Sequence, residues 1–110
     1  MPSATDAIKQ AVREKHPGRD DLEVIGHPKY DDECIARPPT KAEWRMFIAK
    51  RSAPAEAPIA NDFLVEACVL WPEKAERDAL FERRPALLDV WAGELGEMAG
   101  ETLRASRSKL

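Results

Sequence analysis

The chain has 110 residues, a net charge of −3, and a composition that is 44% hydrophobic and 34% charged. This length leaves room for one hydrophobic core, so we expect a single domain over residues 1–110. Lysine and arginine number 17 against 20 acidic residues and form no basic stripe, which argues against nucleic acid as a partner. The first residues lack a signal-peptide pattern and no stretch approaches the roughly 20 apolar residues of a membrane span, so we expect a cytoplasmic protein without a membrane partner.

The N-terminal part of the chain predicts one helix and one hairpin. Ser3 or Thr5 can cap a helix over 5–15, which stops at Pro17. The segment 20–38 contains two short extended runs separated by turn-forming residues, and this pattern predicts a β-hairpin. An isolated hairpin is marginal in water, so this one must pack against an apolar surface.

The range 40–100 predicts a helical bundle. Thr40 and Glu43 have the spacing of a capping box at the start of a helix over 41–51. The nearly continuous apolar run 61–71 predicts a central helix, and a buried strand is the alternative.

Two prolines mark the starts of the last two predicted helices. Pro72 stands before the helix over 73–83 and Pro85 opens the helix over 85–99, because a first-turn proline loses only an N–H that has no partner within the helix. Residues 101–110 are expected to form a basic tail. The predicted fold class is therefore mainly α (α+β), a small helical bundle with an N-terminal helix and a short β-hairpin.

The expected core consists of large apolar side chains from these helices. They are Trp44, Phe47, Ile48, Phe63, Leu64, Ala67, Cys68, Leu70, Trp71, Leu80, Leu87, Leu88, Trp91 and Leu95.

Catalytic and metal-binding motifs do not appear in the sequence. It contains no phosphate-binding loop, nucleophile elbow or zinc-protease motif, so we expect no enzyme activity, no cofactor and no metal. Cys34 and Cys68 stand far apart among apolar neighbours, which predicts two buried free thiols. Asp31 and Asp32 are interpreted as a solvated acidic turn. A metal site that draws on His27, Asp31, Asp32 and Cys34 is the alternative, but this spacing matches no common ligand pattern.

The apolar surplus of so short a chain points to protein binding, since tryptophan and methionine are enriched where proteins meet. The candidate partner-binding residues are those that the expected core cannot absorb: Met46, Phe81, Val90 and Met98, with Arg37 and Arg84 at the edges. Each arginine precedes a proline at a helix entry. A solvated or salt-bridged arginine that serves only the helix entry is the favoured interpretation of both, and a partner contact is the alternative.

Four stretches of the chain resemble one known family. They are 36–44 (ARPPTKAEW), 66–72 (EACVLWP), 84–88 (RPALL) and 98–100 (MAG). Together with the short N-terminal helix and the acidic hairpin, they resemble the tail assembly chaperones of tailed bacteriophages over about residues 20–100.

This resemblance implies a non-catalytic factor in the host cytoplasm that coats the apolar tape measure protein before the tail tube polymerises around it. It also implies weak homo-oligomerisation and a longer form made by frameshifting. It supplies no catalytic or contact residues that could be transferred to this chain.

Two other function classes remain open from the sequence. A small adaptor, immunity or antitoxin-type regulatory protein would also be short, acidic and helical, and the neighbouring genes would distinguish it. A small metal-binding domain or enzyme would use His27, Asp31 and Cys34, and metal analysis of the purified protein would test it.

Overall fold

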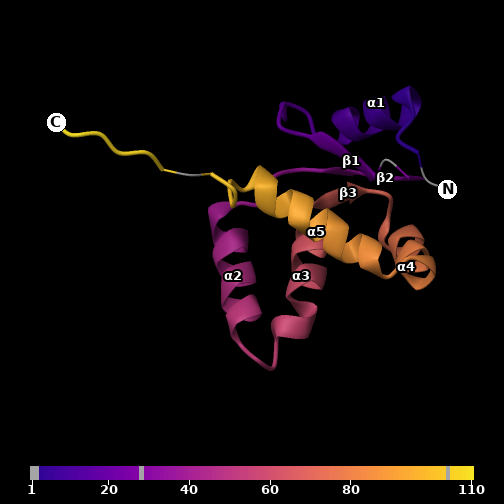
Figure 1. Cartoon of the computed structure of the whole chain (residues 1–110). Coiled ribbons are helices and arrows are strands. Elements are labelled where there is room, and N and C mark those ends of the chain that lie inside the picture. Colours follow the sequence, from indigo (N-terminus) through magenta and orange to yellow (C-terminus); the bar gives the residue numbers. More distant parts are fainter. Residues whose placement is uncertain (1–2, 28, 104) are drawn as a thin grey trace.

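The computed structural model describes residues 3–27, 29–103 and 105–110 (Figure 1). Within them, five α-helices and a three-stranded antiparallel sheet form a mainly helical α+β fold, which confirms the predicted class. In chain order the elements are α1 (Asp6–Lys15), β1 (Glu23–His27), β2 (Tyr30–Ala36), α2 (Lys41–Ser52), the 3-10 helix η1 (Ala57–Ile59), α3 (Ala60–Cys68), β3 (Val69–Trp71), α4 (Lys74–Arg83) and α5 (Ala86–Met98).

The sheet lies between two helical layers. Its strand order is β1-β2-β3, and Figure 1 shows α1 on one side of it and α2, α3 and α5 on the other. Successive side chains of a strand point to opposite faces. Accordingly, Cys34 and Ala36 of β2 belong to the main core, whereas Ile35 belongs to a smaller core with Val12 of α1.

The predicted hairpin is present as β1 and β2, and a third strand extends it and corrects the predicted helix over 61–71. The helix α3 ends at Cys68, and Val69 and Trp71 pair with Ala36 and Ile35 of β2. The prediction of a single helix is therefore wrong over the last three residues of this run, where the strand alternative holds. Without β3, the central strand β2 would leave a row of backbone N–H and C=O groups without ladder partners.

Local capping signals behave largely as predicted. The Thr5 hydroxyl accepts a hydrogen bond from the Ile8 N–H, and Thr40 and Glu43 form both bonds of the capping box. The two helices that were predicted to start beside a proline each begin one residue later than predicted, at Lys74 and at Ala86. Pro72 lies before Glu73, which is the N-cap of α4, and Pro85 is itself the N-cap of α5.

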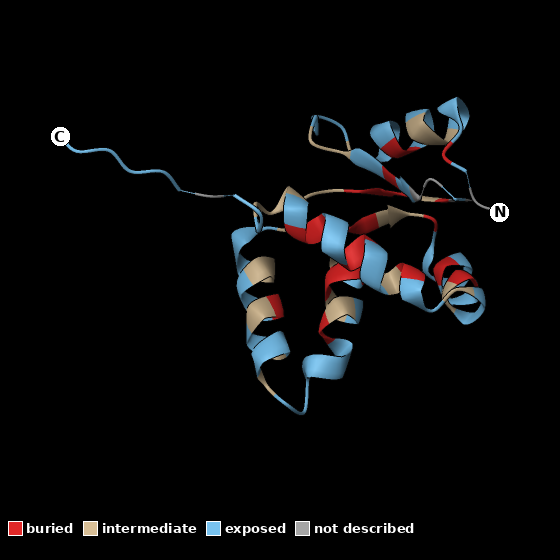
Figure 2. Cartoon of the chain, in the orientation of Figure 1, coloured by how far each residue is buried: buried red, intermediate tan, exposed pale blue. Residues whose placement is uncertain are grey.

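The main core lies where α3 and α5 cross beneath the sheet (Figure 2). Leu64 and Cys68 of α3 and Trp91 and Leu95 of α5 are all 0% exposed. Both thiols are buried, as predicted. The predicted core list omitted several buried strand residues, namely Ile25, Cys34, Ile35, Ala36 and Val69, of which Cys34 was expected only as a buried thiol. Conversely, several residues expected in the core are only partly buried, namely Trp44, Ile48, Phe63, Ala67, Leu70, Trp71 and Leu88.

Across the described part of the chain, every helix is too short or too polar to span a bilayer. Beyond Leu103, the described residues 105–110 are exposed and run away from the body of the protein (Figure 1).

Candidate functional site

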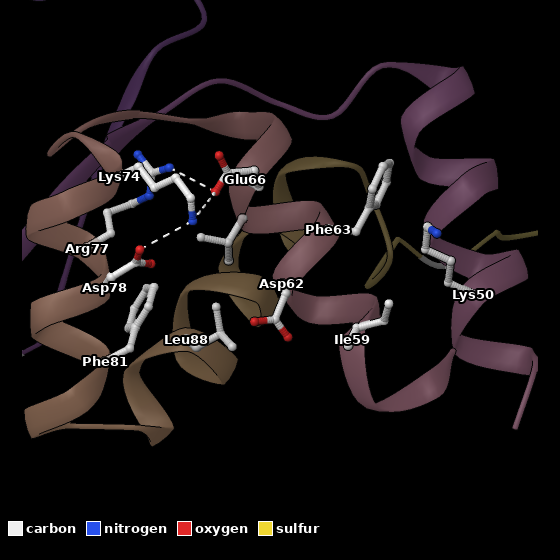
Figure 3. A pocket seen from close by; sticks show the side chains of 11 residues that line it. Lys50, Ile59, Asp62, Phe63, Glu66, Lys74, Arg77, Asp78, Phe81 and Leu88 are labelled. Atoms are coloured by element: carbon white, nitrogen blue, oxygen red, sulfur yellow. Dashed lines mark hydrogen bonds and ion pairs between the residues drawn. The ribbon is translucent and has the colours of Figure 1, made fainter. Parts of the chain in front are cut away.

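A groove of about 480 Å³ opens between α2, η1, α3, α4 and α5 (Figure 3). Its apolar lining consists of Ile59, Phe63, Val65, Phe81 and Leu88. Charged side chains stand beside these residues, namely Lys50, Asp62, Glu66, Lys74, Arg77 and Asp78.

Two helical stripes form opposite walls of the groove. Residues three and four positions apart are neighbours on a helix surface. One stripe has this spacing from η1 into α3 and contains Ile59, Asp62, Phe63 and Glu66. The other has it on α4 and contains Lys74, Arg77, Asp78 and Phe81. Leu88 of α5 lies between the two stripes (Figure 3).

Aromatic rings are the main apolar feature of the groove. Phe63 and Phe81 are each half-buried against the main core, so each leaves part of its surface open to water. Phe81 meets Trp91 edge to face, with 5.4 Å between the ring centroids. The Nζ of Lys50 lies 5.4 Å from the centroid of Phe63. Ile59 is 53% exposed at the rim. The groove therefore presents apolar surface that the core only partly covers.

Most charges of the groove are paired within the protein. Arg77 is 6% exposed, donates from Nη1 to the Pro72 carbonyl oxygen at 2.7 Å, and pairs through Nη2 with Glu66 Oε2 at 3.0 Å. The Nζ atom of Lys74 lies 3.3 Å from Asp78 Oδ2 and 4.0 Å from Glu66 Oε2. Asp62 has neither an ion pair nor a side-chain hydrogen bond with any described residue (Figure 3).

The structure places only one predicted contact residue, Phe81, in the groove. Met46 is 51% exposed and Val90 is 37% exposed, but neither lines the groove. Met98 is partly buried against the main core. The charged residues of the groove were not predicted from the sequence, because each resembles an ordinary solvated residue on a helix. The signal that could have found them is the spacing of Lys74, Arg77, Asp78 and Phe81 on one stripe.

Arg37 is bound inside the fold, which confirms the salt-bridged interpretation. Its Nη1 and Nη2 atoms donate to the two carboxylate oxygens of Glu43 at 2.7 and 2.8 Å, and Nη2 also donates to the Ala67 carbonyl oxygen at 2.7 Å. This bidentate contact lowers the pKa of Glu43 from 4.5 to about 2, and hydrogen bonds with Thr40 act in the same direction. The guanidinium thereby joins the end of β2 to α2 and α3.

Arg84 is also salt-bridged, and the burial of its partner Asp32 contradicts the predicted solvated turn. Arg84 Nη1 lies 2.6 Å from Asp32 Oδ2, and the Asp32 side chain is 0% exposed. The interpretation of Asp32 as part of a solvated turn is therefore wrong. Asp32 shares a face of β2 with Cys34 and Ala36 because the strand alternates, and this face meets the helical layer.

The described residues contain no group of three or more metal-ligating side chains that could hold an ion. The side chains of His27 and Asp31, two members of the alternative metal site, lie outside the described residues. Burial raises the pKa of Cys34 and raises that of Cys68 to about 11. Both thiols are therefore protonated at neutral pH, and a thiol must ionise before it acts as a ligand or a nucleophile.

Comparison of the chain with protein-family models, with curated proteins and with solved structures finds no match.

Proposed function

We propose that this protein is a non-catalytic chaperone that binds an apolar helical segment of a phage tape measure protein in the cytoplasm during tail assembly. The groove between the α3 and α4 stripes is the observation that supports protein binding. The resemblance of the stretches 36–44 and 66–72 to phage tail assembly chaperones supports the choice of partner.

The shape and lining of the groove suit a helix. An amphipathic helix docks by placing its apolar stripe on a complementary apolar groove. Phe63 on the α3 wall, Phe81 on the α4 wall and Leu88 between the walls provide such a surface. A small-molecule site would enclose most of its ligand, whereas the rim residues Ile59, Asp62 and Lys74 are exposed.

The paired charges at the rim suit a protein that must stay dissolved before it meets its partner. The exposed side chains of Lys74 and Glu66 border the apolar lining on one side, with the buried Arg77 paired to Glu66, and these charges limit the contiguous apolar surface exposed to water.

Co-expression tests this proposal. The tape measure protein encoded in the same genome should give a higher soluble yield when the wild-type chain is present. Ile59→Asp, which places a charge at the groove rim, should abolish most of this gain. Val24→Asp is the matched control, because Val24 is 40% exposed against 53% for Ile59 and lies on β1 outside the groove.

Two results would contradict the proposal in different ways. If the wild-type chain leaves the soluble yield unchanged, the chaperone function is wrong. If Ile59→Asp and Val24→Asp both act like the wild type, binding takes place elsewhere on the surface.

A further inference from the structure

We infer that the helix bound in the groove carries a lysine or arginine beside its apolar stripe, and that Asp62 selects this cation. This inference rests on the proposed function, since it specifies the chemistry of the segment that the groove accepts.

Among the described residues, every charged side chain of the groove has an ion-pair partner except Asp62. Lys50 lies 3.8 Å from Glu56. Arg77 and Lys74 share Glu66, and Lys74 also pairs with Asp78. Asp62 alone among these groove residues has no partner from the described part of the chain. Because Lys50 pairs with Glu56, which lies outside the lining, the Asp62 carboxylate is left for a cation of the ligand to neutralise.

Asp62 stands among the apolar contacts rather than at the outer edge of the charged group. It follows Ile59 and precedes Phe63 on the α3 stripe, and Figure 3 shows its carboxylate between Leu88 and Ile59. A helix that covers Phe63 and Leu88 would remove water from this carboxylate. A buried carboxylate is costly without a hydrogen-bonded partner, so a cation on the ligand would compensate for the lost hydration.

A ligand carboxylate at the same place would be rejected. Two like charges that lose water together repel each other strongly, and such repulsion is a common source of specificity between similar partners. The groove should therefore separate apolar helices by the charge that flanks the stripe, in addition to its hydrophobicity.

Asp62 also lies in the first turn of α3, where a negative charge interacts favourably with the helix dipole. This structural role needs its own control. Asp6 has the same role in the first turn of α1 and is equally an exposed aspartate, but it lies outside the groove. Asp6→Asn therefore reproduces the helix-end effect of Asp62→Asn without changing the groove.

The probes are two fluorescent amphipathic peptides of about 18 residues, long enough for a stable helical face. They share one leucine stripe, which is flanked on both sides by lysine in the first peptide and by glutamate in the second. Fluorescence anisotropy at low salt measures their dissociation constants for the full-length wild-type chain and for each variant.

Wild type and Asp6→Asn should bind the lysine peptide roughly five-fold more tightly than the glutamate peptide, the size of a single favourable charge contact. Asp62→Asn should bring this ratio close to one, and Asp62→Lys should reverse it. High salt should reduce the wild-type ratio, because the contact lies at an accessible rim.

The outcomes separate this inference from the proposed function. If both peptides bind, Ile59→Asp weakens both, and Asp62→Asn keeps the wild-type ratio, the charge selection by Asp62 is wrong while groove binding stands. If neither peptide binds the wild type, or if Ile59→Asp binds both as the wild type does, groove binding fails and the inference fails with it.

Discussion

A single guanidinium holds three segments of the chain together. Arg37 at the end of β2 contacts both carboxylate oxygens of Glu43 in α2 and the Ala67 carbonyl oxygen in α3. The Arg37 and Glu43 side chains are 17% and 23% exposed, so solvent screens this pair less than a fully exposed one. Glu43 also completes the capping box with Thr40. One carboxylate thus stabilises both a helix start and a contact between elements.

The depressed pKa of Glu43 predicts acid sensitivity. Its folded pKa of about 2 lies below the ordinary value of 4.5, so its stabilising effect is present above about pH 4.5 and is lost as the pH falls toward 2. Wild type should lose about 2 kcal/mol more unfolding free energy than Glu43→Gln between about pH 6 and pH 3. Urea unfolding at the two pH values measures this difference.

Asp21→Asn provides the control for this prediction. The pKa of Asp21 is also lowered, by a hydrogen bond with Arg19, but both side chains of that pair are more than a third exposed. Removing this exposed pair should change the acid sensitivity much less than Glu43→Gln does. An equal effect of the two variants would mean that burial of the Arg37–Glu43 pair contributes nothing.

At the scale of elements, the ion pair between the buried Asp32 and the partly exposed Arg84 connects the sheet to the junction of α4 and α5. Asp32 is on β2, and Arg84 is the C-cap residue of α4. Asp32 Oδ1 has no hydrogen-bond partner among the described residues. An ion pair with an incompletely satisfied carboxylate gives little net stability, yet removing one partner leaves the other charge buried.

This arrangement predicts an asymmetric double-mutant cycle. Arg84→Leu should destabilise the fold by about 3 kcal/mol, because the Asp32 carboxylate would lose its counterion while it stays buried. The double variant Asp32→Leu with Arg84→Leu should recover a large part of this loss. Thermal or urea unfolding of wild type, both single variants and the double variant measures the coupling. A double variant less stable than Arg84→Leu would contradict this account.

At the scale of the whole molecule, the groove depends on how α4 is placed. The helix α4 follows β3 and Pro72, and it leaves open the surface of Phe63 and Phe81 that a closer helix pair would bury. Arg77 spans this region through its bonds to Pro72 and Glu66. The groove is therefore a consequence of the connection between sheet and helices, and no single helix contains it.

The weak homo-oligomer implied by the resemblance to tail assembly chaperones stays a prediction. The molar mass measured by sedimentation should rise with protein concentration across the micromolar range, as expected for a weak contact. A chain truncated after Leu103 should be measured beside the full-length chain, because residues 105–110 are exposed and lie away from the body (Figure 1). The comparison shows whether this tail contributes to self-association. A mass that stays monomeric at all concentrations would contradict the prediction.

The sequence by itself determined the features that depend on near neighbours. Thr40 and Glu43 mark a helix start because their bonds span three residues. The two short extended runs of the hairpin and the buried character of Cys34 and Cys68 also follow from local patterns. The mainly helical class came from the same kind of information.

Only the tertiary structure decided the features that depend on distant partners. Val69–Trp71 is a strand because β2 needs backbone partners on that edge. Asp32 is buried because Arg84, 52 positions away, supplies its counterion. Which groove charges pair was decided only by the placement of α3 opposite α4, and this placement leaves Asp62 without an ion pair among the described residues. Such partners cannot be assigned from spacing along the chain, because many acidic and basic residues could pair equally well until the elements pack.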